Sequence, residues 1–204
     1  MRITSLKQTS PSRVTVCLDD GAEIRSTPTA VTELRLFTGR ELDDTDLEAL
    51  VRESRRALAR EKALELVSQR QMSAKELAKK LRDKGFDEET ADYCTAWAAQ
   101  RGFLDEERYA AAVVRHYAAK GYGEGRVRQE LIRRGVPREL WEDALSAMPE
   151  DTSKLDRYIA SRLKNPEDRD EVRKLSASLF RRGYAAEEIR SALDRFRAAY
   201  EYED

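Results

Sequence analysis

The sequence has few of the residues that cross-link chains, end helices or catalyse reactions. Its 204 residues include two cysteines, nine glycines, five prolines and one histidine. Cys17 and Cys94 are far apart and lack a CxxC spacing, so we interpret both as small buried residues of a reducing compartment. No signal segment follows Met1, and no run approaches the roughly 18 apolar residues of a membrane span. We therefore expect a cytoplasmic protein.

An excess of charge of one sign is also missing. The chain has 38 basic and 39 acidic residues, which give a formal net charge of −1. No overall field would then attract nucleic acid, and any polyanion binding needs local clusters of positive charge. Charged residues make up 38% of the chain and aromatic residues 7%, a balance that favours helices with one apolar stripe and a solvated outer face.

Residues for catalysis are scarce as well. His116 lies beside the predicted buried face of its helix, so we expect a packed or half-exposed ring without catalytic or metal-binding partners. The glycine-rich segment 121–125 follows no strand and precedes no Lys-Ser/Thr, unlike a phosphate-binding loop. Acid pairs such as Glu106-Glu107 stand where helices are expected to begin. We expect no enzyme, no cofactor and no metal.

The N-terminal part differs from the rest. Two β-prone runs, Val14–Leu18 and Ala22–Arg25, flank Asp20-Gly21, a hairpin signature because glycine accepts the positive φ of a tight turn. With Met1–Gln8, these runs predict a small antiparallel sheet of about three strands. Two helices should follow, the first over Thr29–Phe37, ending near Gly39, and the second from about Asp44, whose side chain can cap it.

Beyond residue 60 the chain repeats itself around Gly85, Gly135 and Gly183. The three copies agree in an aliphatic residue eight and four positions before the glycine, a base just before it, a large apolar residue just after it, and a glutamate four positions after it. We call each of these positions a repeat column. In the order just given, with the three repeats in sequence within each column, the residues are Leu77, Val127, Leu175; Leu81, Leu131, Leu179; Lys84, Arg134, Arg182; Phe86, Val136, Tyr184; Glu89, Glu139, Glu187. A period near 50 residues indicates a stacked helical array.

Each column has a physical interpretation. Aliphatic residues four apart share one face of a helix, and the glycine supplies the left-handed residue that ends it. A base suits the negative end of that helix, and an acid suits the positive end of the next one. Every unit thus has a helix, a glycine turn and a second helix.

A further helix precedes each of these pairs. In the first unit it stops before Ser73 and Glu76, which form a capping box between Met72 and Leu77. In the second unit Asp105 caps a helix with Tyr109, Val113 and Tyr117 at four-residue spacing, and in the third Thr152 or Ser153 opens a helix with Leu155, Ile159 and Leu163. Asn165-Pro166 should begin the next helix, with proline at its first position.

We therefore predict a mainly α fold with three tandem three-helix repeats in an extended, curved array, preceded by a small antiparallel β-containing N-terminal domain. The expected boundaries are 1–57 for the N-terminal extension and 58–103, 104–149 and 150–204 for the repeats.

The order of several segments resembles the RecX family, regulatory proteins of the recombinase RecA. The segments are Gly102-Phe103-Leu104-Asp105-Glu106-Glu107-Arg108-Tyr109-Ala110, Lys120-Gly121-Tyr122-Gly123, Arg126-Val127-Arg128-Gln129-Glu130-Leu131 and Arg133-Arg134-Gly135-Val136. The resemblance is close over residues 60–148, the third unit keeps the repeat columns, and the N-terminal part is similar to the β-containing extension of longer members.

The resemblance implies a protein of DNA repair, homologous recombination and the SOS response without enzymatic activity. It implies a protein that binds RecA filaments on single-stranded DNA, in the groove or at the growing end. We also expect a monomer and a weak direct contact with DNA. It also implies that RecA's ATP hydrolysis, strand exchange and coprotease activity are lowered.

Local charge suggests where a partner binds. Residues 108–135 contain seven bases against Glu124 and Glu130, whereas residues 41–48 and 139–151 are acidic. Arg126, Arg133 and Arg134 should share one helix face, and Tyr122 should project from a loop. The RecA- or DNA-binding candidates are Arg115, Lys120, Tyr122, Arg126, Arg128, Arg133, Arg134, Lys79, Lys80 and Arg82.

Plainer interpretations remain open. Each base can belong to a solvated helix face, Tyr122 can pack under its turn, and Trp97 and Trp141 fit core positions better than a nucleobase platform. A stand-alone nucleic-acid-binding helical module is the alternative to RecA regulation, and a purely structural helical adaptor is a third hypothesis.

Overall fold

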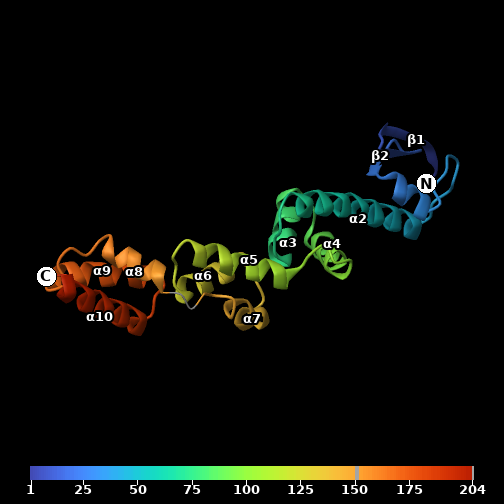
Figure 1. Cartoon of the computed structure of the whole chain (residues 1–204). Coiled ribbons are helices and arrows are strands. Elements are labelled where there is room, and N and C mark those ends of the chain that lie inside the picture. Colours follow the sequence, from blue (N-terminus) through green and yellow to red (C-terminus); the bar gives the residue numbers. More distant parts are fainter. Residues whose placement is uncertain (150–151, 204) are drawn as a thin grey trace. The chain divides into compact units, whose positions relative to one another are not determined.

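The computed structural model describes residues 1–149 and 152–203 (Figure 1). The chain forms two compact units, Met1–Asp105 and Glu106–Asp204, which we describe separately. The predicted mainly helical fold with a small antiparallel sheet is confirmed. The expected start of the third repeat at residue 150 and the acidic residues Glu150 and Asp151 lie outside the described residues. In the part of the chain that the structure describes, no helix is long and apolar enough to cross a membrane.

Three strands open the first unit. They are β1 (Ile3–Ser10), β2 (Arg13–Leu18) and β3 (Glu23–Ser26), paired antiparallel in the order β1-β2-β3. At the β2–β3 turn Gly21 has a φ of 88°, as the Asp-Gly signature predicts, and the Leu18 amide donates to the Ala22 carbonyl at 2.9 Å.

The first helix ends earlier than predicted. Helix α1 covers Pro28–Glu33 instead of continuing to residue 37. Arg35 adopts a left-handed φ of 51°, and the Leu36 amide donates to the Val31 carbonyl at 2.9 Å, which closes the helix as a C-terminal cap. This end could not be predicted because an arginine takes the place that glycine usually holds.

Helix α2 (Asp44–Gln69) is a single helix of 26 residues that joins the sheet to the first repeat. Its cap is Asp43, not Asp44 as predicted, because the Asp43 carboxylate accepts from the Asp46 amide at 2.7 Å. Leu50 packs with the sheet, whereas Ala59 and Leu66 belong to the core of the first repeat. The expected boundary between residues 57 and 58 therefore falls inside this helix.

Helices α3 (Ala74–Asp83) and α4 (Glu88–Gln100) complete the first repeat. Ser73 caps α3 as predicted and accepts from the Glu76 amide at 3.1 Å. Both cysteines are buried and free, as predicted. Burial raises the pKa of the Cys94 thiol to about 11, so this thiol stays protonated in the core.

The second repeat opens the second unit with α5 (Glu106–Ala119) and α6 (Glu124–Arg134). Its last helix is short and split into the 3-10 turn η1 (Arg138–Leu140) and α7 (Trp141–Leu145). Trp141 is a core residue, as expected, and its Nε1 donates to the Val136 carbonyl at 3.0 Å.

The third repeat contains α8 (Ser153–Ala160), α9 (Arg169–Arg181) and α10 (Ala186–Glu203). The prediction that α9 begins at Asn165-Pro166 is wrong. The Asn165 side chain accepts from the Glu167 amide at 2.9 Å and forms a turn. Asp168 then caps α9 by accepting from the amides of Asp170 and Glu171 at 2.8 and 3.2 Å.

The repeat columns keep their predicted register. Leu81, Leu131 and Leu179 are each 0% exposed. The residue after each glycine donates its amide to that leucine's carbonyl, at 3.3 Å from Phe86, 3.0 Å from Val136 and 3.3 Å from Tyr184. The φ values of Gly85, Gly135 and Gly183 are 91°, 67° and 88°. All three helices thus end in the same left-handed cap.

Candidate functional site

The predicted basic face of α6 surrounds a buried acid. Glu130, whose side chain is 4% exposed, lies 3.0 Å from Arg126, 2.7 Å from Arg133 and 3.8 Å from Arg134 between their closest nitrogen and oxygen atoms. Arg134 also donates to the Tyr109 hydroxyl at 3.0 Å. The structure therefore brings these three candidates together, as predicted. They surround a carboxylate that already neutralises part of their charge.

The ionisation of Glu130 depends on these neighbours. Burial by itself raises the pKa of this carboxyl, but hydrogen bonds from Arg133 and Tyr117 and the charges of Arg133 and Arg126 outweigh it. The pKa of Glu130 consequently lies below its usual value. The cluster carries three positive charges and one negative charge at neutral pH.

Arg128 is paired as well. Its guanidinium donates to Glu124 at 2.6 Å and to Glu142 at 3.0 Å, and these hydrogen bonds, that of Glu142 first, raise the pKa of Arg128. Both acids are exposed, so the two pairs contribute little to stability. They do compensate the charge of Arg128, which makes α6 less basic toward a partner than its sequence suggests.

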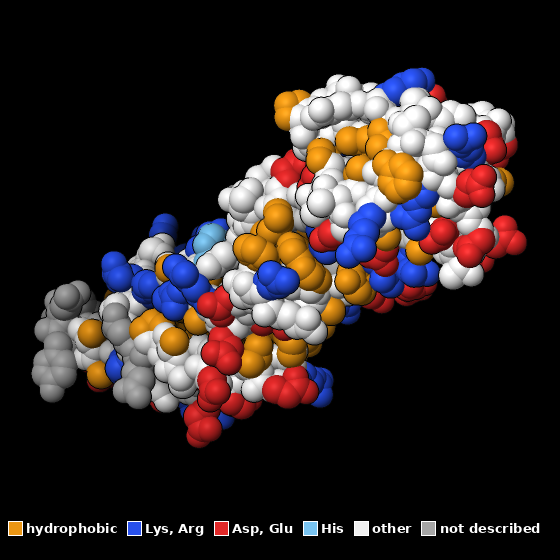
Figure 2. All heavy atoms as spheres, turned by 90° about the vertical axis from the view of Figure 1, so that its right-hand side faces the viewer, with side chains coloured by type: hydrophobic (Ala, Val, Ile, Leu, Met, Phe, Trp, Pro, Cys, Tyr) orange, Lys and Arg blue, Asp and Glu red, His pale blue; other side chains and the backbone are white. Residues whose placement is uncertain are grey.

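Arg115 and Lys120 are exposed near the end of α5. His116 is exposed too, which corrects the expectation of a packed or half-exposed ring. Its ring lies 5.2 Å from that of Tyr117, between centroids, in a T-shaped arrangement. Figure 2 shows the histidine in pale blue beside a group of basic side chains.

Tyr122 does not project freely from its loop, contrary to our expectation. It is half-buried, with its ring 5.7 Å from that of Tyr117, and the Arg182 guanidinium lies 4.7 Å from its centroid. The plainer interpretation, in which Tyr122 packs at the turn, describes this residue better. The contact with Arg182 comes from a residue 60 positions later, which no local pattern indicates.

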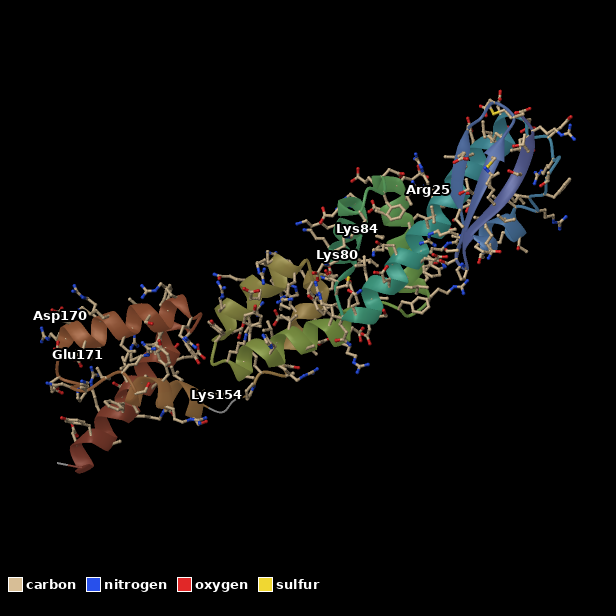
Figure 3. All side chains as sticks on the ribbon, turned by 90° about the horizontal axis from the view of Figure 1, so that it is seen from above. Arg25, Lys80, Lys84, Lys154, Asp170 and Glu171 are labelled. Carbon is tan, nitrogen blue, oxygen red and sulfur yellow. The ribbon has the colours of Figure 1, made fainter. Side chains whose placement is uncertain are left out.

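The remaining candidates lie on α3 in the first unit. Lys79 is exposed and Lys80 is half-buried, while Arg82 pairs with Asp92 at 3.5 Å. Figure 3 labels Lys80 together with Lys84, the base of the first repeat column. These cations form a group of their own within the first unit.

A second basic cluster, absent from the predicted set except for Lys120, lies where the second and third repeats meet. Arg182 donates to the backbone carbonyls of Lys120 at 3.0 Å and Gly121 at 3.3 Å, and Lys154 donates to the Ala118 carbonyl at 3.2 Å. Figure 3 shows Lys154 at the beginning of α8. The sequence marks Arg182 only as the base before a glycine, so its reach across the junction could not be predicted.

Glycines allow the second and third repeats to approach each other closely at this junction. The amides of Gly123 and Gly125 donate to the carbonyls of Arg182 and Gly183 at 3.0 and 2.9 Å. A Cβ atom on Gly183 would lie 2.1 Å from the Arg126 nitrogen, so only glycine fits there. The same contact gives the glycine-rich segment at the start of α6 a packing role.

Among the described residues, no group of three or more His, Cys, Asp or Glu side chains could hold a metal ion. The candidate site is therefore a set of surfaces with arginine, lysine and tyrosine side chains, whose chemistry suits binding of an acidic or phosphate-bearing partner.

Comparison with known proteins agrees with the repeat organisation. The model of the first three-helix domain of RecX matches residues 59–95, and that of the second three-helix domain matches residues 105–145. The regulatory protein RecX of Vibrio vulnificus is 33% identical over 64% of this chain and 88% of its own length. The chain belongs to the RecX family. A RecX of Xanthomonas axonopodis pv. citri is 35% identical over 65% of this chain and 83% of its own length.

Solved structures share the fold. A crystal structure of regulatory protein RecX has a TM-score of 0.76 and 23% identity, and covers 95% of this chain and 98% of its own. RecX from Lactobacillus salivarius has a TM-score of 0.62 and 20% identity, and covers 69% of this chain and 96% of its own. The predicted membership of the RecX family and the helical-repeat fold are thus confirmed.

Proposed function

We propose that this chain is a non-catalytic modulator, specifically an inhibitor, of RecA nucleoprotein filaments. The observation that carries the proposal is the 33% identity to a regulatory protein RecX over 88% of that relative's length. Similarity over nearly a whole relative favours a shared role more than a shared domain does. The protein would lower RecA's ATP hydrolysis, strand exchange and coprotease activity, and would do so in the cytoplasm as a monomer.

The mechanism we propose is binding without chemistry. The chain lodges in the filament groove or at the growing end, with its repeats, bounded near residues 58–103, 104–149 and 150–204, against neighbouring RecA protomers. Contacts would come from the candidate cations on α3, α5 and α6. Repeat proteins suit this task because successive units present an extended surface.

The arginines of α6 already form ion pairs within this chain, and these pairs affect how a partner can bind. A partner's acid that approaches Arg128 or Arg133 must compete with Glu124, Glu142 or Glu130 of this chain. Such exchange of ion pairs yields modest affinity per contact and favours a partner whose acids match the geometry. Specificity would then come from many weak contacts along the repeats.

The test is RecA's single-strand-dependent ATP hydrolysis, measured with the cognate RecA while this protein is titrated from far below to above one chain per RecA protomer. Action at filament ends predicts a loss of hydrolysis well below one chain per protomer, and action in the groove predicts a loss that follows the ratio. Undiminished hydrolysis at a molar excess, with RecA and DNA both active, would refute the proposal.

A further inference from the structure

The junction of the second and third repeats contains a groove lined almost entirely by basic, aromatic and small residues. Its volume is about 390 Å³, and its walls are Ala119, Lys120, Gly121, Lys154, Arg157, Tyr158 and Arg182. Four of these seven residues are cations and none is an acid. The groove belongs wholly to the second unit, so its geometry does not depend on how the two units are placed.

Neutral acceptors hold three of these four cations. Arg182 donates to two backbone carbonyls and Lys154 to a third, while Arg157 donates to the Ser153 carbonyl at 3.1 Å. In the described part of the chain, none of the ion pairs includes Lys120, Lys154, Arg157 or Arg182. A carbonyl orients a cation but leaves its net charge uncompensated, in contrast to the carboxylates beside the arginines of α6.

Aromatic rings fix the central arginine. The Arg182 guanidinium lies close to two rings, 4.7 Å from the centroid of Tyr122 and 4.6 Å from that of Tyr158. The Tyr158 hydroxyl is within 3.2 Å of Ser178, which positions that ring. This hydrogen bond, followed by the charges of Arg162 and Arg182, lowers the pKa of Tyr158, as expected beside positive charge. The arginine is thus held in place before any ligand arrives.

We propose that this junction groove is a phosphate-binding site, occupied by a phosphate of a single-stranded nucleic-acid backbone or of a free nucleotide. Four cations on one small groove can donate to more acceptor oxygens than a single carboxylate offers. The terminal phosphate of a nucleotide supplies more oxygens and more charge, and a nucleic-acid backbone supplies them through successive phosphates. The groove would complement the α6 cations, where a phosphate must first displace a carboxylate of the same chain.

The experiment uses the full chain without RecA. A fluorescent single-stranded oligonucleotide is titrated with the protein at several salt concentrations and followed by anisotropy. The test variant is Lys154→Gln with Arg157→Gln, and the matched control is Arg173→Gln with Lys174→Gln, which removes the same charge from exposed positions of α9 in the same unit. Circular dichroism melting compares folding, and Arg157→Gln alone replaces the double variant if the double variant melts early.

We expect the groove variant to weaken oligonucleotide binding about tenfold and to lower the slope of log affinity against log salt by about 1, with little change in the control. Competition by an unlabelled nucleoside triphosphate separates the two sources. Displacement at matched phosphate concentration identifies a free nucleotide, and displacement only at large excess identifies the backbone.

Equal losses in the groove and control variants, or no loss in either, would overturn the proposal. So would displacement of the oligonucleotide by polyglutamate at the same charge concentration, since the groove would then recognise carboxylates of a protein. Because RecA is absent, these outcomes are independent of whether the chain inhibits RecA's ATP hydrolysis.

Discussion

At the scale of single residues, the positions of the basic side chains were easier to predict than their partners. The four-residue spacing places Arg126 and Glu130 on one face of α6, but the sequence does not reveal that Glu130 is buried with three arginines around it. Nor does it reveal that Arg182 reaches carbonyls more than 60 positions earlier. Ionic partners across repeats depend on packing that no local pattern encodes.

Burial of the leucines four positions before the repeat glycines can be tested at Leu131 of α6, which is 0% exposed in the core of the second repeat. Leu131→Ala should lower the free energy of unfolding by about 2–5 kcal/mol, because the cavity it leaves can refill only in part. The neighbouring Ile132→Ala is the control, since Ile132 is 56% exposed and should change stability by less than about 0.5 kcal/mol. Urea denaturation measures both, and equal effects would disprove the assigned register.

The pKa shift of Glu130 predicts a pH-dependent stability. Its pKa is lower in the folded chain than in the unfolded one, so its contribution is complete above the ordinary value of about 4.3 and is lost as the pH falls through the folded value. Glu130→Gln should therefore reduce the free energy of unfolding by about 1–3 kcal/mol at pH 7.

The difference between Glu130→Gln and the unsubstituted chain should shrink below about pH 4.3, because the Glu130 carboxyl then becomes protonated and neutral like the amide that replaces it. Thermal melting from pH 7 to pH 3 follows this convergence. A gap that stays constant over the whole range would mean that the substituted amide disturbs packing and that the ion pairs contribute nothing.

At the scale of helices and turns, signals within a few residues of each other were predictable. The capping serine of α3 and the three repeat glycines occupy the places that the sequence assigns them. Three helix ends were predicted wrongly. Arg35 takes a left-handed conformation usual for glycine at the end of α1, Asp43 rather than Asp44 caps α2, and Asp168 rather than Asn165 caps α9. At the two N-terminal ends, several polar residues can serve as the cap, and the sequence does not decide between them.

The repeat glycines offer a matched comparison. Gly85 and Gly183 have φ values of 91° and 88°, but an added Cβ meets nothing within 4 Å at Gly85 and lies 2.1 Å from the Arg126 nitrogen at Gly183. Gly85→Ala should cost about 1–2 kcal/mol for the left-handed backbone alone. Gly183→Ala should cost about 1–3 kcal/mol more, because the two repeats must move apart.

Hydrogen exchange provides a second measurement for this pair of variants. The amides of Gly123 and Gly125, which donate across the junction, should exchange faster in Gly183→Ala and at an unchanged rate in Gly85→Ala. Equal stability losses with unchanged exchange at both amides would show that the junction does not depend on the absence of a side chain at residue 183.

At the scale of the whole molecule, the proposed function rests on family membership and on the repeat organisation. A net charge of −1 offers no general attraction to DNA, so the DNA contact that we propose would depend on local groups such as the junction groove. The ordered motifs between residues 102 and 136 were specific enough to predict the RecX family, which the relatives confirm. The partner's contact residues remain a prediction, because they depend on complementarity to a second surface.

We propose that the chain recognises the RecA filament and not merely the DNA inside it. The most direct test is anisotropy of the fluorescently labelled chain, titrated with cognate RecA filaments assembled on single-stranded DNA with a slowly hydrolysed ATP analogue, and in parallel with the same DNA alone. We predict at least about tenfold tighter binding to the filament, or about 1.4 kcal/mol. Equal affinity with and without RecA would refute recognition of the filament and identify a stand-alone nucleic-acid-binding module.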